Sequence, residues 1–116
     1  MKLAKNKTTF HNVVIVNRLY YSIYQVIVNY INQNGLLVNT NTRNSHRRCI
    51  DAFITDITCS MPNENRIGMI QVKINDLKRD RGKADYKDGS FTDQNTEKRI
   101  NNAKTVMTFF KEKSFI

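Results

Sequence analysis

The most regular feature of the chain is the return of apolar side chains every three or four positions, the period of an amphipathic α-helix. The longest such segment covers residues 9–34, where an apolar stripe faces a polar one. Asn34 and Gly35 should end this helix, because glycine readily takes the left-handed conformation of a helix C-terminus. The apolar stripe consists of Val13, Val16, Tyr20, Ile23, Ile27 and Tyr30.

The same period predicts three further helices. The second covers residues 45–60, with Ser45 as its N-cap and Pro62 beyond its end. The third covers residues 64–83, and the fourth covers residues 93–113. We therefore expect one all-α domain over residues 1–116, an antiparallel bundle of four to five helices.

The third helix carries an arginine on its apolar stripe. The stripe runs through Ile70, Ile74 and Leu77, and four positions further lies Arg81, whereas Arg79 falls on the outward face. A guanidinium facing the packed side must be paired, because an unpaired buried charge is costly. Two interpretations remain open. Either Arg81 pairs with Asp85 inside the chain, or it faces a groove or interface and binds phosphate.

The charge balance adds a hint about partners. Lys and Arg total 19 against 10 Asp and Glu, a formal net charge of +9, which attracts polyanions, although many basic domains bind none. The segment RNSHRRC, residues 43–49, places His46 and Arg47 at the start of the second helix, where backbone N–H groups favour an anion. This segment is either a phosphate site or a solvated basic cap.

Three tyrosines of the first helix lie next to a cation, Arg18. Tyrosines beside a cation could stack on bases, but tyrosines at helical spacing are more often core residues. Tyr20 and Tyr24 fit the core, while Tyr21 lies nearer the polar edge and is left as a candidate for ligand contact.

Other kinds of site have little support. Cys49 and Cys59 lack zinc-ligand spacing, and there is no phosphate-binding glycine loop or hydrolase motif, so we expect neither a metal nor a cofactor. Polar residues interrupt the longest apolar stretch, residues 10–31. We therefore expect a cytoplasmic protein without a membrane span.

Three stretches, covering about four-fifths of the chain, carry a family resemblance. They read NRLYYSIYQVIVNYINQNG, SHRRCIDAF and RDRGKADYKDGSFTDQNTEKRINNAKTVMTFFKE. Together they resemble the HEPN domains, small helical modules associated with nucleotides and RNA. The third stretch is similar to that family's Arg-x-x-Ala-Asp-Tyr signature, here Arg81 to Tyr86.

The resemblance implies an antiparallel bundle that commonly forms a homodimer, with the signature arginine near the dimer cleft. In toxin-like members, an arginine followed four to six residues later by histidine cleaves RNA without a metal. Many members are encoded with a minimal nucleotidyltransferase as a toxin–antitoxin or phage-defence pair. Here Tyr86 stands where that histidine would be. Tyrosine, with a pKa near ~10, is a poor proton shuttle compared with histidine near ~6.5.

Three functional hypotheses follow. The first is an RNA- or nucleotide-binding protein without the usual ribonuclease activity. The second is a metal-independent endoribonuclease toxin, with Arg81, Tyr86 and His46 as catalytic candidates. The third is a structural module that binds a partner, such as a nucleotidyltransferase antitoxin. For the first hypothesis the predicted ligand- and phosphate-binding residues are Arg81, Asp85, Tyr86, Arg18, Tyr21 and Arg47.

Overall fold

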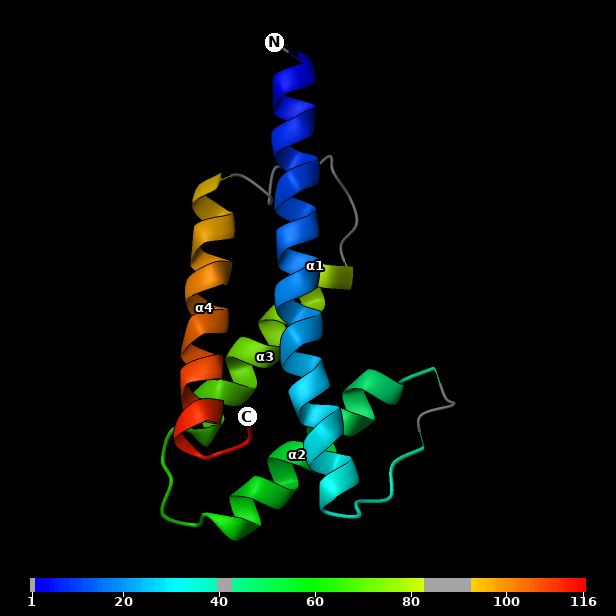
Figure 1. Ribbon diagram of the computed structural model, residues 1–116, viewed down its shortest axis with the longest axis vertical. Helices are drawn as coiled ribbons and strands as arrows, with labels where there is room; N and C mark the ends of the chain where they lie inside the picture. Colours follow the sequence, from blue (N-terminus) through cyan, green and yellow to red (C-terminus); the bar gives the residue numbers. More distant parts are fainter. Residues whose placement is uncertain (1, 40–42, 83–92) are drawn as a thin grey trace.

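The computed structural model describes the backbone of residues 2–39, 43–82 and 93–116, and the side chains of residues 11–39, 43–80 and 94–116. Within these ranges the chain is all helical and contains no strand. The helices are α1 (Lys2–Gln33), α2 (Ser45–Ser60), α3 (Ile67–Gly82) and α4 (Asp93–Glu112) (Figure 1). The prediction of an all-α helical bundle is confirmed.

The helix boundaries agree with the apolar periodicity, with differences at some N-termini. α1 begins at Lys2 rather than at residue 9, in a segment rich in good helix formers and free of glycine and proline. The N-cap of α2 is Asn44, which makes no side-chain cap bond, so the assignment to Ser45 was wrong. α3 begins at Ile67 rather than at residue 64. Glu64 lies before the helix, and its carboxylate accepts a hydrogen bond from the backbone N–H of Arg66 at 3.2 Å.

The antiparallel arrangement is only partly correct. α1 and α4 lie side by side and run in the same direction, whereas α3 crosses behind α1 in the opposite sense (Figure 1). α2 also advances in the same sense as α1, because two hydrogen bonds, Tyr20 to His46 and Tyr30 to Asp56, each join residues separated by 26 positions. Periodicity within one helix carries no information about the direction of its neighbour, which explains the error.

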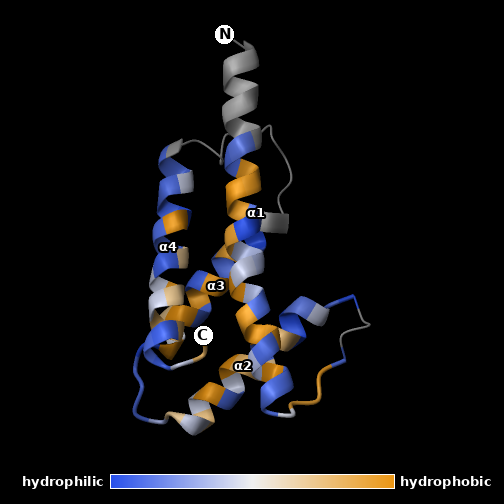
Figure 2. Ribbon diagram, viewed as in Figure 1, coloured by the Kyte–Doolittle hydropathy of each residue, from blue (hydrophilic) through white to orange (hydrophobic). Residues whose placement is uncertain are grey.

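The core lies where the predicted stripes meet (Figure 2). The apolar positions from which the second and third helices are predicted are buried: Ile50, Phe53, Ile54 and Ile57 in α2, and Ile70, Ile74 and Leu77 in α3. The polar side chains opposite the α1 stripe are exposed. A cluster of aromatic rings from α1, α2, α4 and the C-terminal residues closes one end of the core. Most of these contacts are edge-on, and the rings of Phe110 and Phe115 are tilted by 58°. The members of the cluster are Tyr30, Phe53, Phe109, Phe110 and Phe115.

Two helices end in the same way. At the end of α1, the backbone N–H of Leu36 bonds the carbonyl of Ile31 and that of Gly35 bonds the carbonyl of Asn32, with Gly35 at φ +64°. The end of α4 repeats this pair of backbone hydrogen bonds. Ser114, at φ 60°, takes the position that Gly35 has in α1. Both are Schellman motifs, which need one residue in the left-handed conformation. Gly35 suits that conformation, whereas Ser114 adopts it at a cost.

We predict opposite effects of two substitutions at these ends. Ser114→Gly should raise the free energy of unfolding by about 0.5 to 1 kcal/mol, because it relieves the left-handed strain. Gly35→Ala should lower it by about 1 kcal/mol. No atom lies within 4 Å of a Cβ built on Gly35, so the second effect comes from the backbone alone. Urea denaturation of both variants and the parent measures the two changes in the free energy of unfolding. Changes of the same sign would contradict the assignment of a left-handed residue to both helix ends.

Candidate functional site

Several predicted site residues lie outside the part of the chain whose side chains are described. Asp85 and Tyr86 belong to residues 83–92, and Arg81 is placed only as backbone in the last turn of α3. The helical period that places Arg81 on the apolar face of α3 agrees with the burial of the residues before it. Leu77 is fully buried, and the side chain of Arg79 is 63% exposed and pairs with Asp76. The roles of Arg81, Asp85 and Tyr86 stay predictions.

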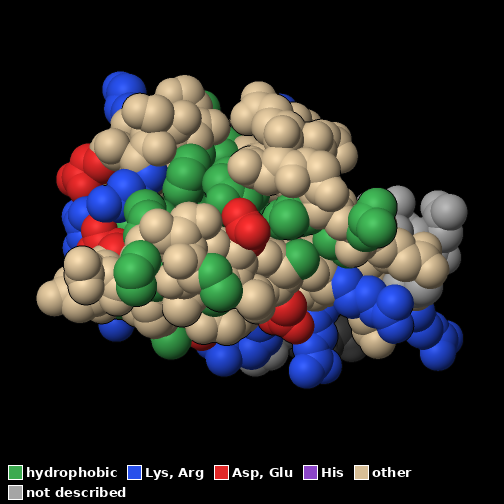
Figure 3. Space-filling view, turned by 90° about the horizontal axis from the view of Figure 1, so that it is seen from below, with side chains coloured by type: hydrophobic (Ala, Val, Ile, Leu, Met, Phe, Trp, Pro, Cys, Tyr) green, Lys and Arg blue, Asp and Glu red, His purple; other side chains and the backbone are tan. Residues whose placement is uncertain are grey.

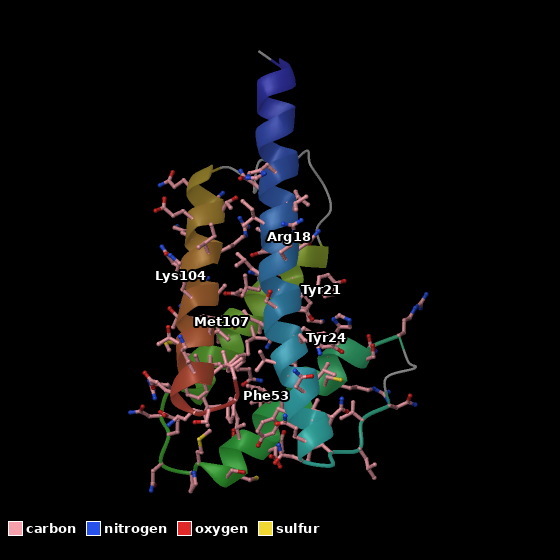
Figure 4. The ribbon with its side chains drawn as sticks, in the orientation of Figure 1. Arg18, Tyr21, Tyr24, Phe53, Lys104 and Met107 are labelled. Atoms are coloured by element: carbon pink, nitrogen blue, oxygen red, sulfur yellow. The ribbon has the colours of Figure 1, made fainter. Side chains whose placement is uncertain are left out.

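Arg18 and Tyr21 project from the same exposed side of α1 (Figure 4). Tyr21 is 48% exposed, so part of its ring is open to solvent. The two side chains lie along a shallow groove of about 800 Å³, whose other wall includes Met107 of α4 and Ile116. The structure therefore brings an open aromatic ring and a cation together on one surface.

His46 reaches this surface from the first turn of α2. Its Nδ1 lies 2.7 Å from the hydroxyl of buried Tyr20, and the two are hydrogen bonded. Its ring stacks on Tyr24 at a centroid distance of 3.9 Å and an angle of 4°. Tyr21 stands edge-on to the His46 ring at 6.2 Å. We call these four residues (Tyr20, Tyr21, Tyr24 and His46) the tyrosine–histidine cluster.

Sequence reasoning identified the members of this cluster but missed their contacts. It assigned Tyr20 and Tyr24 to the core and left Tyr21, nearer the polar edge, as a candidate for ligand contact. Tyr20 is fully buried, Tyr24 is partly buried against the core, and Tyr21 is 48% exposed. It treated His46 as part of the basic start of the second helix, with no link to the tyrosines. The only available signal was the position of His46 in the first turn of a helix that had to pack on α1, and this does not specify a partner.

The cluster continues inward to a buried thiol. Cys49 is 1% exposed and lies beside the phenol of Tyr24. Burial raises the pKa of Tyr24 well above its usual value of 10.0, and the Cys49 contact adds to the shift. Further along α1, Tyr30 donates a short hydrogen bond to the carboxylate of Asp56 on α2. Burial and this bond raise the pKa of Tyr30 to about 12.

The basic start of α2 adjoins the cluster through His46. Arg43, Arg47 and Arg48 are all exposed, and Arg47 forms a long surface pair with Asp51 at 3.7 Å. Such a solvated pair contributes little to stability and leaves the guanidinium accessible. Figure 3, seen from below, shows Lys and Arg side chains gathered along one edge on the side where α2 begins. The predicted phosphate site and the cluster are thus neighbours.

An ion pair that sequence reasoning missed secures the end of α3. Asp80 accepts a hydrogen bond from Nε of Arg99 on α4 at 2.7 Å, and the two side chains are only 12% and 14% exposed. Arg81, the arginine predicted to form the site, is the next residue along α3. The pair fixes the last turn of α3 against α4, and that turn carries the backbone of Arg81.

Comparisons with protein-family models, with curated proteins and with solved structures found no match. Among the described residues, no group of three or more His, Cys, Asp or Glu side chains could hold a metal ion. None of the helices in the described ranges has the length and apolar character needed to cross a membrane.

We predict that alkaline pH weakens the contact between α1 and α2. The folded state favours neutral Tyr30, so its stabilisation is complete below about pH 10 and declines as the pH rises toward about 12. The free energy of unfolding should therefore fall over this interval, and Tyr30→Phe should make the fall shallower. Denaturant melts at several alkaline pH values measure the slope. An unchanged slope in Tyr30→Phe would contradict this assignment.

We also predict that the Asp80–Arg99 pair contributes to stability. Asp80→Ala removes the carboxylate that pairs with the largely buried guanidinium of Arg99 and should cost more than about 1 kcal/mol. Asp76→Ala breaks the exposed pair with Arg79 and should cost less than about 1 kcal/mol. Thermal denaturation of the two matched variants distinguishes them. Equal losses would show that burial does not strengthen the Asp80 pair.

Proposed function

We propose that this chain is a HEPN-like helical protein that binds RNA or a nucleotide. The observation that most supports this proposal is the half-exposed ring of Tyr21. The ring lies between Arg18 on α1 and His46 at the basic start of α2. The sequence resemblance to HEPN domains is the second support for the proposal. A homodimer and a nucleotidyltransferase partner are further expectations from that resemblance.

The chemistry of the surface suits a base next to a phosphate. A base stacked on an aromatic side chain contributes roughly 1 to 3 kcal/mol, whatever the base, since every base has a π face. Tyr21 meets Tyr20 edge-on at 5.5 Å and His46 at 6.2 Å, and these contacts restrict its ring. A restricted ring loses less side-chain entropy when a ligand binds. Arg18 offers a forked donor to phosphate one turn away along α1.

The charge of the protein supports an anionic ligand. The chain carries a formal net charge of +9, and the exposed arginines at the start of α2 extend the surface around Tyr21. A long polyanion such as RNA would contact both regions, while a single nucleotide would occupy only one. Because phosphate contacts release counterions, RNA binding should weaken steeply with salt.

A catalytic role has one observation in its favour. The hydrogen bond between Tyr20 and Nδ1 of His46 orients an imidazole beside Tyr21, and an oriented imidazole can transfer protons near neutral pH. The same bond and the stack on Tyr24 also suit a purely structural role. We therefore retain the endoribonuclease as the second candidate and binding without cleavage as the first.

We predict that a fluorescein-labelled oligouridylate binds the protein and that Tyr21→Ala weakens binding about tenfold, the loss of one stacked base. Tyr21→Phe should retain most of the affinity, because its ring still stacks. Arg18→Ala should also weaken binding. Lys104→Ala removes one charge from the far side of the bundle and is its matched control (Figure 4). Fluorescence anisotropy at low and moderate salt measures all four variants.

If Arg18→Ala and Lys104→Ala lowered the affinity for oligouridylate equally, a defined site would be contradicted, since only net charge would then matter. Incubating RNA with the protein in EDTA tests cleavage. Intact RNA is expected, whereas cleavage that His46→Ala abolishes would establish the endoribonuclease instead. Unchanged affinity in a folded Arg81→Ala variant would exclude Arg81 from the binding site.

A further inference from the structure

The groove that holds Arg18 and Tyr21 continues along α1 toward the C-terminal end of that helix, where Gln25 and Asn29 also line it. Met107 of α4 lines the same groove, and Arg18, Tyr21 and Met107 can be located in Figure 4. From Arg18 to Asn29 the helix rises about 16 Å, since each residue adds about 1.5 Å. None of the described residues that line the groove is acidic, so an anionic ligand meets no carboxylate along it.

Gln25 and Asn29 form a pair of amides with unused hydrogen-bonding groups. Nε2 of Gln25 donates to Oδ1 of Asn29 at 3.0 Å, and both side chains are exposed. Each amide has two N–H donors and a carbonyl acceptor. Among the described residues, this one bond therefore leaves donors on both side chains and the carbonyl oxygen of Gln25 open to a ligand. Ser22 differs, because its hydroxyl donates to the carbonyl of Arg18 at 2.8 Å.

The amide pair suits the edge of a nucleic-acid base. Such an edge carries neighbouring donors and acceptors, and Asn and Gln side chains pair with it through two hydrogen bonds. The bond between Gln25 and Asn29 also restrains both side chains before a ligand arrives, which lowers the entropy lost on binding. The groove thus presents a cation, an aromatic ring and an amide pair in that order, to match a phosphate, a base face and a base edge.

The spacing of these groups indicates more than one nucleotide. The amide pair extends from about 6 Å to about 12 Å beyond Tyr21 along the helix axis, because Gln25 and Asn29 follow it by four and eight positions. The edge that meets the amides therefore belongs to a base next to the stacked one. Both the face and the edge of a base are accessible only where the strand is unpaired, since a duplex covers the faces by stacking and the edges by pairing.

We propose that this groove binds single-stranded RNA, with one base stacked on Tyr21 and the edge of the next base hydrogen bonded by Gln25 and Asn29. Arg18, one turn before Tyr21, binds the phosphate on the other side of the stacked base. The proposal rests on the proposed function and adds to it the class of RNA and two residues that contact a base. Duplex RNA does not fit, and a mononucleotide leaves the amide pair without a partner.

Fluorescence anisotropy at moderate salt tests the class of RNA, since salt suppresses binding by charge alone. The probes are the fluorescein-labelled oligouridylate, the same strand annealed to oligoadenylate, and unlabelled uridine monophosphate as a competitor. We expect the single strand to bind at least about tenfold more tightly than the duplex or the mononucleotide. Equal affinity for the duplex, or for the mononucleotide, would overturn this inference and leave the proposed function standing.

A matched pair of variants tests the amide contact. Gln25→Leu removes the amide and keeps a side chain of similar size, and it should weaken oligouridylate binding about tenfold. Gln94→Leu makes the same change at an exposed position of α4 outside the groove and should have no effect. An oligomer of 3-methyluridine still stacks but lacks the N3–H donor of the base edge, so Gln25→Leu should scarcely change its affinity. Equal losses with the two oligomers, or equal behaviour of the two variants, would overturn the amide contact.

Methyl NMR locates the bound strand. Oligouridylate should shift the methyl signal of Met107, which lines the groove, and leave that of Met69, which lies on α3 outside it. A shift of Met69 alone would overturn the inference. Binding that is unchanged in Tyr21→Ala and Arg18→Ala overturns the proposed function and this inference with it. Binding that is weakened in those two variants but unchanged in Gln25→Leu overturns this inference alone.

Discussion

Burial of the apolar stripe of α1 is the constraint on which the rest of the structure depends. The stripe is covered by α2, α3 and α4, and its residues from Val16 to Ile27 are almost free of solvent contact. Full burial of one such side chain stabilises the fold by roughly 1.5 to 3 kcal/mol, so several together outweigh any single ion pair. Their burial also sets the rotation of α1 about its axis, and that rotation determines which side chains reach the surface.

The proposed ligand surface follows from that rotation. With Tyr20 buried, its neighbour Tyr21 must emerge at the edge of the stripe, where α2 brings His46 against it. This surface joins an aromatic ring to cations.

Prediction from sequence succeeded where the physics is local. A helical period reports which residues of a segment share a face, so the stripes of α2 and α3 and the exposed face with Arg18 were all found. It says nothing about how two helices cross. The stack of His46 on Tyr24 and the Asp80–Arg99 pair each depend on such a crossing, and both were missed. The sites expected at Asp85 and Tyr86 lie outside the described residues.

The shared direction of α1, α2 and α4 bears on how the chain reaches its fold. Neighbouring helices that run the same way cannot be joined by a tight turn, so their contacts connect residues far apart in sequence, as in the 26-residue interval from Tyr20 to His46. Closing such long intervals costs entropy before any packing rewards it. Folding rates fall as contacts become less local. This molecule should therefore fold more slowly than an up-and-down bundle of equal size and helix content.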